Sequence, residues 1–138
     1  MNAAKIIFYI LSEDTAVTTA LGTSAVNGSM VKIYRHVAPQ KETAPFITFS
    51  QIPSSGDQTA PGLKVRTVKY MVNCWAVTPD AADTIAELAI EALDNVSGEV
   101  DGLKFDNILY LDDDEAFVPN LDPPLYGRQI EFQIRIAL

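Results

Sequence analysis

The chain has 138 residues, about the length of one domain, and a fold of this size can bury roughly two thirds of its extended surface. Apolar residues make up 48% and charged residues 20% of the sequence, a composition that excludes a wholly disordered protein. Eighteen acidic and ten basic residues give a net charge of -8, which repels a DNA backbone and argues against a sequence-specific DNA reader. The single cysteine, Cys74, excludes an internal disulfide framework and a zinc site built from several cysteines.

No apolar run approaches the length of about 18 residues that a transmembrane helix needs. The opening apolar run, residues 6–11, is preceded only by Lys5 and is followed by polar residues where a signal peptide would have a small-residue cleavage site. We therefore expect a protein with no membrane contact that is located in the cytoplasm or in an assembly built there. The sequence shows no internal repeat or low-complexity linker, so residues 1–138 are expected to form a single domain.

Apolar residues spaced by three and four predict a first helix over residues 3–11, followed by a short capped stretch that ends at Gly22. β-branched and aromatic residues predict short strands over residues 30–35 and 46–49. Residues 53–63 have no periodicity and are rich in Pro, Ser and Gly, which predicts a long loop at the end of a hairpin.

The next strand, expected over residues 64–77, has one continuous apolar face formed by its even-numbered positions. Its odd-numbered positions are mixed in character and include Met71, Trp75 and Val77. If the even face packs on helices, these three large side chains point away from the helices and are candidate residues of a subunit interface. A second layer of the same domain that covers them remains the alternative.

Thr78, Pro79 and Asp80 form a strong helix start, with a capping hydroxyl, a proline at the first position and an acidic residue at the positive end of the helix dipole. This helix is expected to end near Leu93. A strand is expected over residues 103–111, after a turn.

Residues 112–125 are acidic and then rich in proline, and we expect a solvated loop there. Strict alternation over residues 129–136 predicts a last strand with one buried and one polar face. The order helix, three strands, helix, two strands predicts an α+β fold. It would be a two-layer sandwich with a mainly antiparallel sheet of about five strands, two helices on one face and a long hairpin loop.

No constellation in the sequence predicts an enzyme, a cofactor or a metal site. Cys74 lies in the middle of the apolar face of a strand, where a buried cysteine is inert, and no third residue is placed to orient the single histidine, His36. No glycine-rich phosphate loop and no nucleophile elbow occur. The acidic run Asp112, Asp113, Asp114 and Glu115 lacks the alternating ligands and the glycine of a calcium loop, so divalent-ion binding stays an alternative to a solvated segment.

Several segments in combination resemble the small tail-completion proteins of long-tailed bacteriophages, also called tail terminators or head–tail joining proteins. The segments are Ile33-Tyr34, Ala38-Pro39-Gln40, Ala44–Phe49 and the strand end Val72–Ala76, which is followed at once by a capped helix. The alternating C-terminal strand fits as well, and the resemblance covers roughly residues 3–111 and 127–137.

The resemblance implies a structural virion protein that forms a homohexameric ring at the neck of the particle, assembled in the host cytoplasm. Such a ring caps the head-proximal end of the tail tube, ends its polymerisation and joins the tail to the head connector, while double-stranded DNA passes through without sequence-specific binding. Its partners would be other copies of the chain, the major tail tube protein and the connector.

On this basis two segments are assigned expected roles. The long loop is expected to dock on the tail tube through Ser54, Ser55, Gly56, Asp57, Gln58 and Thr59. Residues 112–115 are expected to line the opening, where their charge would keep DNA from adhering during transit.

Three alternatives remain open from the sequence. Another neck or tail-tube component would stack rather than form a ring that limits itself. A small enzyme would use Cys74 and His36, and its cysteine would react with an alkylating reagent in the native state. A monomeric ligand-binding or regulatory domain would present a pocket instead of a surface for other subunits.

Overall fold

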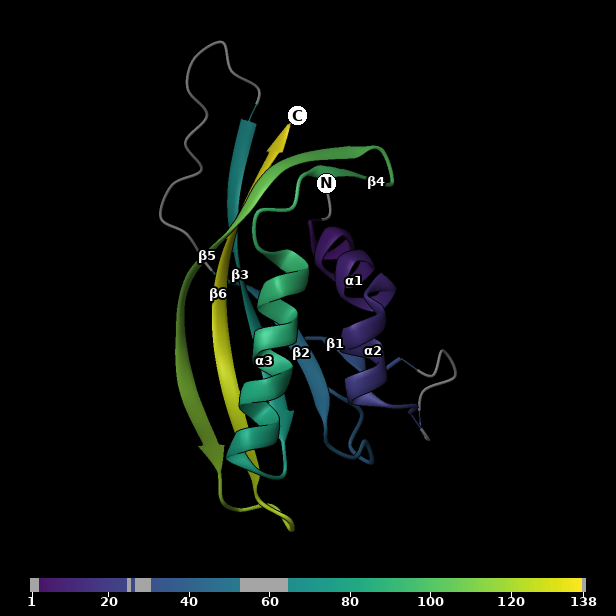
Figure 1. Ribbon diagram of the computed structural model, residues 1–138, viewed down its shortest axis with the longest axis vertical. Coiled ribbons are helices and arrows are strands. Elements are labelled where there is room, and N and C mark those ends of the chain that lie inside the picture. Colours follow the sequence, from purple (N-terminus) through teal and green to yellow (C-terminus); the bar gives the residue numbers. More distant parts are fainter. Residues whose placement is uncertain (1–2, 25, 27–30, 53–64, 138) are drawn as a thin grey trace.

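The computed structural model describes residues 3–24, 26, 31–52 and 65–137. Three helices lie together on one face of a six-stranded curved sheet (Figure 1). The fold is therefore α+β with two layers, as the order of elements predicted. Residues 54–59, expected to dock on the tail tube, lie outside the described residues.

The helix layer consists of α1 (Ala4–Glu13), α2 (Thr15–Leu21) and α3 (Pro79–Leu93). Asp14 separates the first two helices, because its carboxylate accepts a hydrogen bond from the N–H of Val17 at 3.0 Å and so caps α2. The capped stretch expected before Gly22 is thus a helix of its own, which makes three helices instead of two. The start of α3 is confirmed, with Thr78 Oγ1 accepting from the N–H of Ala81 at 3.2 Å.

The sheet has the strand order β1-β2-β3-β6-β5-β4, and all neighbouring strands are antiparallel except β1 and β2. The strands are β1 (Ile33–Arg35), β2 (Phe46–Ile52), β3 (Val65–Ala76), β4 (Gly98–Val100), β5 (Leu103–Val118) and β6 (Leu125–Ala137). The predicted sheet of about five strands lacked β4. That strand has only three residues, too few for periodicity to show, and it forms because it pairs with Leu103–Phe105 of β5.

The core lies between the helices and the even-numbered positions of β3, as predicted. Paired residues of neighbouring strands share a face, so the same face carries Phe49 of β2 and Phe132 of β6. The largest fully buried side chains are Tyr70, Phe49, Phe132, Ile6, Ile7, Leu11, Ile47, Leu93, Ile108, Ile130, Ile134 and Ile136. We call this the inner face of the sheet, and the opposite one the outer face.

The prediction of a loop over residues 112–125 is wrong for its first half. β5 continues to Val118, and the acidic run pairs residue by residue with Glu131 to Arg128 of β6. The register shifts between Tyr110 and Asp112, and such a bulge breaks the alternation from which a strand is recognised in a sequence. Backbone pairing with β6 therefore sets the conformation of the acidic run, and only residues 119–124 connect the two strands.

Candidate interaction surfaces

The strand conformation divides the acidic run between the two faces of the sheet. Asp113 pairs with the core residue Ile130, so Asp113 and Glu115 belong to the inner face. Asp112 and Asp114 alternate with them and belong to the outer face, next to Glu131 and Gln129 of β6 respectively. The four carboxylates are therefore two pairs with different surroundings.

Arg128 of β6 holds the inner pair. Its Nη2 lies 2.8 Å from Asp113 Oδ1, its Nη1 3.5 Å from Glu115 Oε1, and its Nε 3.6 Å from Asp83 Oδ1 of α3. Burial opposes the charge of the guanidinium, but the hydrogen bond to Asp113 and the three carboxylates outweigh this effect and raise the pKa of Arg128. One side chain thus ties together β5, β6 and α3.

The outer face is not covered by any of the described helices. Met71 and Trp75 lie on it half-buried, while Val77 follows the end of β3 and is exposed. The indole Nε1 of Trp75 donates to Thr48 Oγ1 at 3.2 Å. The ring covers Gly127, where an added Cβ would lie 2.7 Å from two of the ring carbons. Trp75 is therefore packed in a fixed position on a face that none of the described helices covers.

A groove of about 730 Å³, here called the outer-face groove, lies where β3 ends. Its walls are Trp75, the connection between β1 and β2, and the connection between β5 and β6. Val77 lines it, whereas Met71 does not. Val37 on its rim is 76% exposed, so the groove combines an apolar wall with an apolar rim.

A polar cluster fastens the connection of residues 36–45 that borders this groove. Glu42 Oε2 accepts from Ser24 Oγ at 2.5 Å and from the hydroxyl of Tyr34, and its Oε1 accepts from the N–H of Thr43 at 3.0 Å. Burial disfavours the carboxylate, but these three hydrogen bonds and the charge of Lys32 together lower the pKa of Glu42.

The lowered pKa of Glu42 predicts a pH-dependent contribution to stability. Because the folded pKa lies below the ordinary value of 4.5, the contribution is present above that value and is lost as the pH falls below it. Glu42→Gln is expected to lower the free energy of unfolding at pH 7 by about 1 kcal/mol. Urea unfolding of the wild type and of Glu42→Gln at pH 7 and at pH 3.5 measures this loss. A difference in unfolding free energy between the two proteins that does not shrink at pH 3.5 would contradict a stabilising role of the Glu42 carboxylate.

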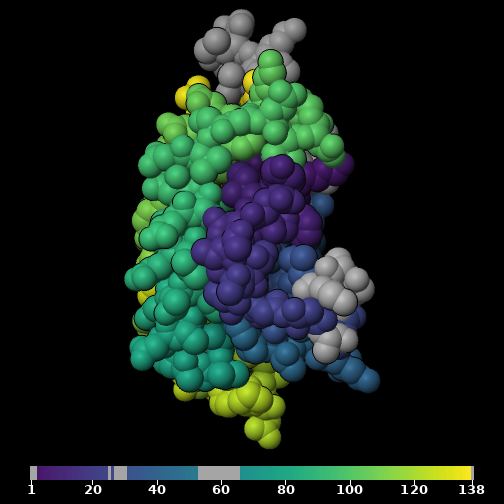
Figure 2. Space-filling view, turned by 45° about the vertical axis from the view of Figure 1, so that its right-hand side comes forward, coloured from purple at the N-terminus to yellow at the C-terminus, as the bar shows by residue number. Residues whose placement is uncertain are grey.

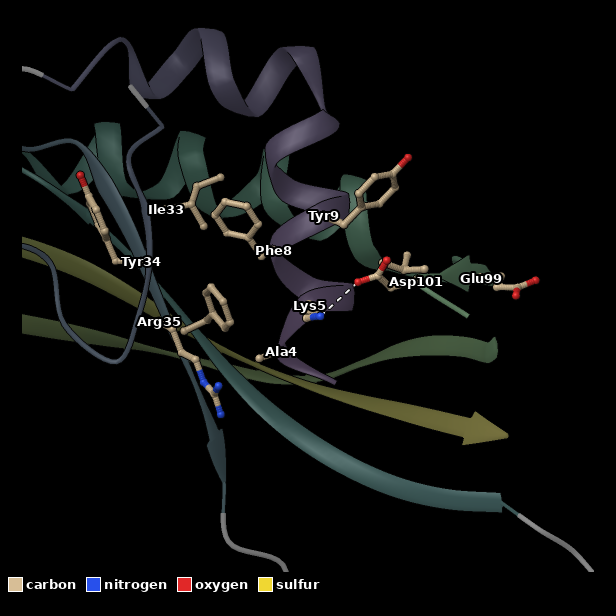
Figure 3. A pocket seen from close by; sticks show the side chains of 11 residues that line it. Ala4, Lys5, Phe8, Tyr9, Ile33, Tyr34, Arg35, Glu99 and Asp101 are labelled. Carbon is tan, nitrogen blue, oxygen red and sulfur yellow. Dashed lines mark hydrogen bonds and ion pairs between the residues drawn. The ribbon is translucent and has the colours of Figure 1, made fainter. Parts of the chain in front are cut away.

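A second groove, here called the edge groove, lies between α1, β1 and the β4–β5 turn and encloses about 600 Å³ (Figure 3). Phe8, Ile33 and Phe49 give it an apolar floor. At one end Lys5 Nζ lies 3.1 Å from Asp101 Oδ2, and at the other the exposed guanidinium of Arg35 points away from the floor (Figure 3).

The two residues considered for catalysis have different environments. Cys74 is fully buried, and burial raises its pKa to about 12, so the thiolate that a nucleophile needs is strongly disfavoured. His36 is exposed and has a positive φ of 72°, at the point where the chain leaves β1.

We expect Cys74 to resist alkylation in the native protein. At pH 8 iodoacetamide should modify it at least about a hundredfold more slowly than in the urea-unfolded chain, because modification must wait for opening of the core. Mass spectrometry over a time course measures both rates. Equal rates would show a reactive cysteine and would revive the enzymatic alternative.

The described residues contain no group of three or more His, Cys, Asp or Glu side chains arranged to hold a metal ion. Among the helices that the structure describes, none is sufficiently long and apolar to cross a membrane.

Sequence reasoning missed the Arg128 cluster and the edge groove. A signal for the first was present, since Arg128 extends the series of even-numbered inward positions that begins at Ile130. A cation at an inward position requires carboxylates nearby, and the acidic run supplies them. The edge groove joins residues that lie far apart in the chain, so local patterns carried no signal for it.

The architecture places the chain among small two-layer α+β proteins, with the described helices all on one face of the sheet. The family model described as tail completion protein gp17 matches residues 5–137, and the chain belongs to this family. It is therefore a tail structural protein of a phage virion, and the family resemblance noted in the sequence is confirmed.

Two solved structures share the fold. A chain from the structure titled "Virion of native gene transfer agent (GTA) particle" superimposes with a TM-score of 0.70 at 11% identity, covering 96% of this chain and 92% of that one. A second chain has a TM-score of 0.53 at 9% identity and covers 99% of this chain and 98% of that one. No curated protein matches the sequence.

Proposed function

We propose that the protein is a tail terminator. Six copies would form a ring that caps the head-proximal end of the tail tube, ends its polymerisation and joins the tail to the head connector, with the double-stranded DNA passing through. The observation that carries this proposal is the family match over residues 5–137, which spans both layers of the fold. The protein would act at the neck of the virion after assembly in the host cytoplasm.

The uncovered outer face supplies the proposed contact residues. Trp75 and Val77 line the outer-face groove and Met71 lies on the same face, so a neighbouring subunit that covers this face would bury all three. Trp75 is held in place by Thr48 and Gly127, and a rigid aromatic residue loses little entropy when a partner packs on it.

Residues 54–59 remain the proposed docking loop for the tail tube. In the sequence they lie between β2 (Phe46–Ile52) and β3 (Val65–Ala76), outside the described residues. Their proposed role rests on the sequence, which has the composition of a long connection that binds a partner.

The proposed lining of the opening narrows to two of the four acidic residues. Asp113 and Glu115 are ion-paired with Arg128 on the inner face, whereas Asp112 and Asp114 lie on the outer face, opposite Glu131 and Gln129. If a neighbouring subunit covers the β2–β3 side of the outer face and leaves its β5 side toward the opening, Asp112 and Asp114 would face the DNA, which would then pass without binding.

A structural rather than catalytic role is part of the proposal. The buried thiol of Cys74 supports this role, because it is kept away from solvent and from its ionised form. The protein would accordingly need no cofactor, and its activity would reside in its contacts.

The deciding experiment is the solution mass across a concentration series, with and without the tail-tube protein. A species of six times the 15.1 kDa chain mass that caps and shortens the tubes would support the proposal. Trp75→Ala should weaken this assembly, while Gln133→Ala, farther along the outer face, serves as the matched control.

Two other results would overturn the proposal. A protein that is monomeric at every concentration and leaves the tubes unchanged would exclude the proposed ring. Stacks of growing length would indicate a tube component instead of a terminator.

A further inference from the structure

The helix layer exposes one apolar surface, which lies on α1. Phe8 and Tyr9 follow Lys5 by three and four residues, so the three side chains lie on one side of the helix, here called the α1 stripe. Phe8 is 38% and Tyr9 51% exposed, and no other large apolar side chain is exposed on the described helices. Figure 2 shows α1, in purple, at the surface between α3 and the segment of β1 and β2.

The outer-face groove lies on the opposite side of the molecule. The helices cover the inner face of the sheet, whereas Trp75 and Thr48 of the outer face line the groove. The groove is also lined by three exposed apolar side chains, those of Val37, Val77 and Leu121. Its volume of about 730 Å³ lies within the range of roughly 300–1,000 Å³ found for pockets that enclose a drug-sized molecule, so aromatic side chains fit inside.

The walls of this groove are fixed before any partner binds. Thr48 and Gly127 hold the ring of Trp75. The hydrogen bonds of Glu42 fasten the connection between β1 and β2, which forms another wall. A partner that enters a groove of this kind has little ordering entropy to overcome.

The lining of the groove is acidic. It contains Glu42 and Asp122 but no lysine or arginine. Asp122 is exposed, and no cation of the described residues lies within ion-pair distance of it. The groove therefore favours an apolar surface that brings a positive charge or no net charge.

The apolar side chains exposed on β5 do not meet this requirement. Leu111 and Phe117 are exposed, but the acidic run lies between them. Carboxylates also accept hydrogen bonds from the N–H groups along this edge: Asp94 from Tyr110 at 3.0 Å, Asp112 from Asp113 at 2.8 Å, and Asp114 from Glu115 at 2.8 Å. β5 of a second copy would thus place like charges against the acidic lining, which is unfavourable.

The α1 stripe meets the requirement. α1 contains one lysine, Lys5, and one glutamate, Glu13, so the helix side chains have no net charge. Lys5 lies 3.1 Å from Asp101 of the same copy, but the two side chains are 57% and 66% exposed. An exposed pair of this kind is weak, so Lys5 can exchange its partner at little cost.

We propose that the α1 stripe of one copy packs in the outer-face groove of the next copy. Its two aromatic rings would pack on Trp75 and Leu121, and Lys5 would approach Asp122. The two surfaces lie on opposite layers of the domain, so the contact is heterologous and repeats from copy to copy until a rotation closes it. This inference rests on the proposed ring and names the surface of the neighbour that covers the outer face.

A pair of cysteines tests the contact. In a chain that carries Tyr9→Cys and Leu121→Cys, oxidation should link each copy to the next, and a denaturing gel should show products of up to six chains. Each single variant should stay monomeric on the gel, because the two positions belong to different surfaces. The pair Glu87→Cys and Leu121→Cys, with one cysteine on the exposed acidic side of α3, is the matched control and should give at least about tenfold less product.

The strength of association gives a second measurement. Tyr9→Asp is expected to weaken self-association at least about tenfold, because it replaces an aromatic contact with a charge of the same sign as the lining. Glu87→Lys should change it by less than about threefold. Sedimentation with and without tail tubes measures both variants, and circular dichroism checks that each is folded.

The outcomes separate this contact from the proposed terminator. Rings that form equally well in Tyr9→Asp, or equal cross-linking of the control pair, would overturn the contact and leave the terminator intact. Cross-linked dimers as the largest product would show a symmetric contact and would also overturn it. A wild type that never self-associates, with or without tubes, would overturn both.

Discussion

Phe132→Ala is expected to lower the free energy of unfolding by about 3–5 kcal/mol. Phe132 is fully buried on the inner face of β6, opposite Tyr70 of β3 and edge-on to Tyr110 of β5 at a centroid distance of 6.2 Å. The change removes the ring that joins three neighbouring strands, and the stiff sheet cannot close the resulting cavity. Urea unfolding followed by circular dichroism measures the loss.

The neighbouring residue gives the matched control. Gln133 lies on the outer face of the same strand, and Gln133→Ala is expected to change stability by no more than about 0.5 kcal/mol. Equal losses for the two variants would contradict the assignment of inner and outer faces in β6.

Gly127→Ala is expected to cost about 1–3 kcal/mol, because the new Cβ would lie 2.7 Å from two carbons of the Trp75 ring. The indole is bonded to Thr48 through its Nε1 and cannot move aside without losing that hydrogen bond. Thermal unfolding measures the cost. If the proposed outer-face contact is right, displacement of Trp75 should also weaken assembly.

Introducing Gly127→Ala into the Trp75→Ala variant tests whether the cost of the change comes from the clash with the indole ring. Without the ring, Gly127→Ala should be neutral or stabilising by a few tenths of a kcal/mol, since alanine restricts the unfolded chain more than glycine does. A cost that persists in this background would show that something other than Trp75 excludes a side chain at Gly127.

The elements that were predicted correctly are those whose own residues contain a signal for their structure. The start of α3 follows from Thr78 and Pro79, and the two faces of β3 and β6 follow from their alternation. Both can be recognised from a short segment of sequence, because a helix cap involves about four residues and the alternation of a strand is evident within about eight.

The elements that the sequence did not predict depend on contacts between residues that lie far apart in the chain. β4 exists through its pairing with β5, and the acidic half of β5 is extended because β6 bonds to it and Arg128 balances its charge. Four consecutive carboxylates predict a solvated loop in any local treatment. Of the proposed contact residues, the sequence indicated Trp75 and Val77 correctly as lying away from the helices, but their groove is made by two connections that no local pattern brings together.

The carboxylates along β5 also bear on how the chain behaves before it is incorporated. A strand edge with free donors recruits like edges, and at the concentrations reached in an infected cell such edges lead to fibrils and precipitates. Asp94, Asp112 and Asp114 occupy those donors with groups of the same molecule, and their charge repels an identical edge. These contacts are therefore expected to disfavour pairing of β5 with an identical edge and to help the folded chain stay in solution before assembly.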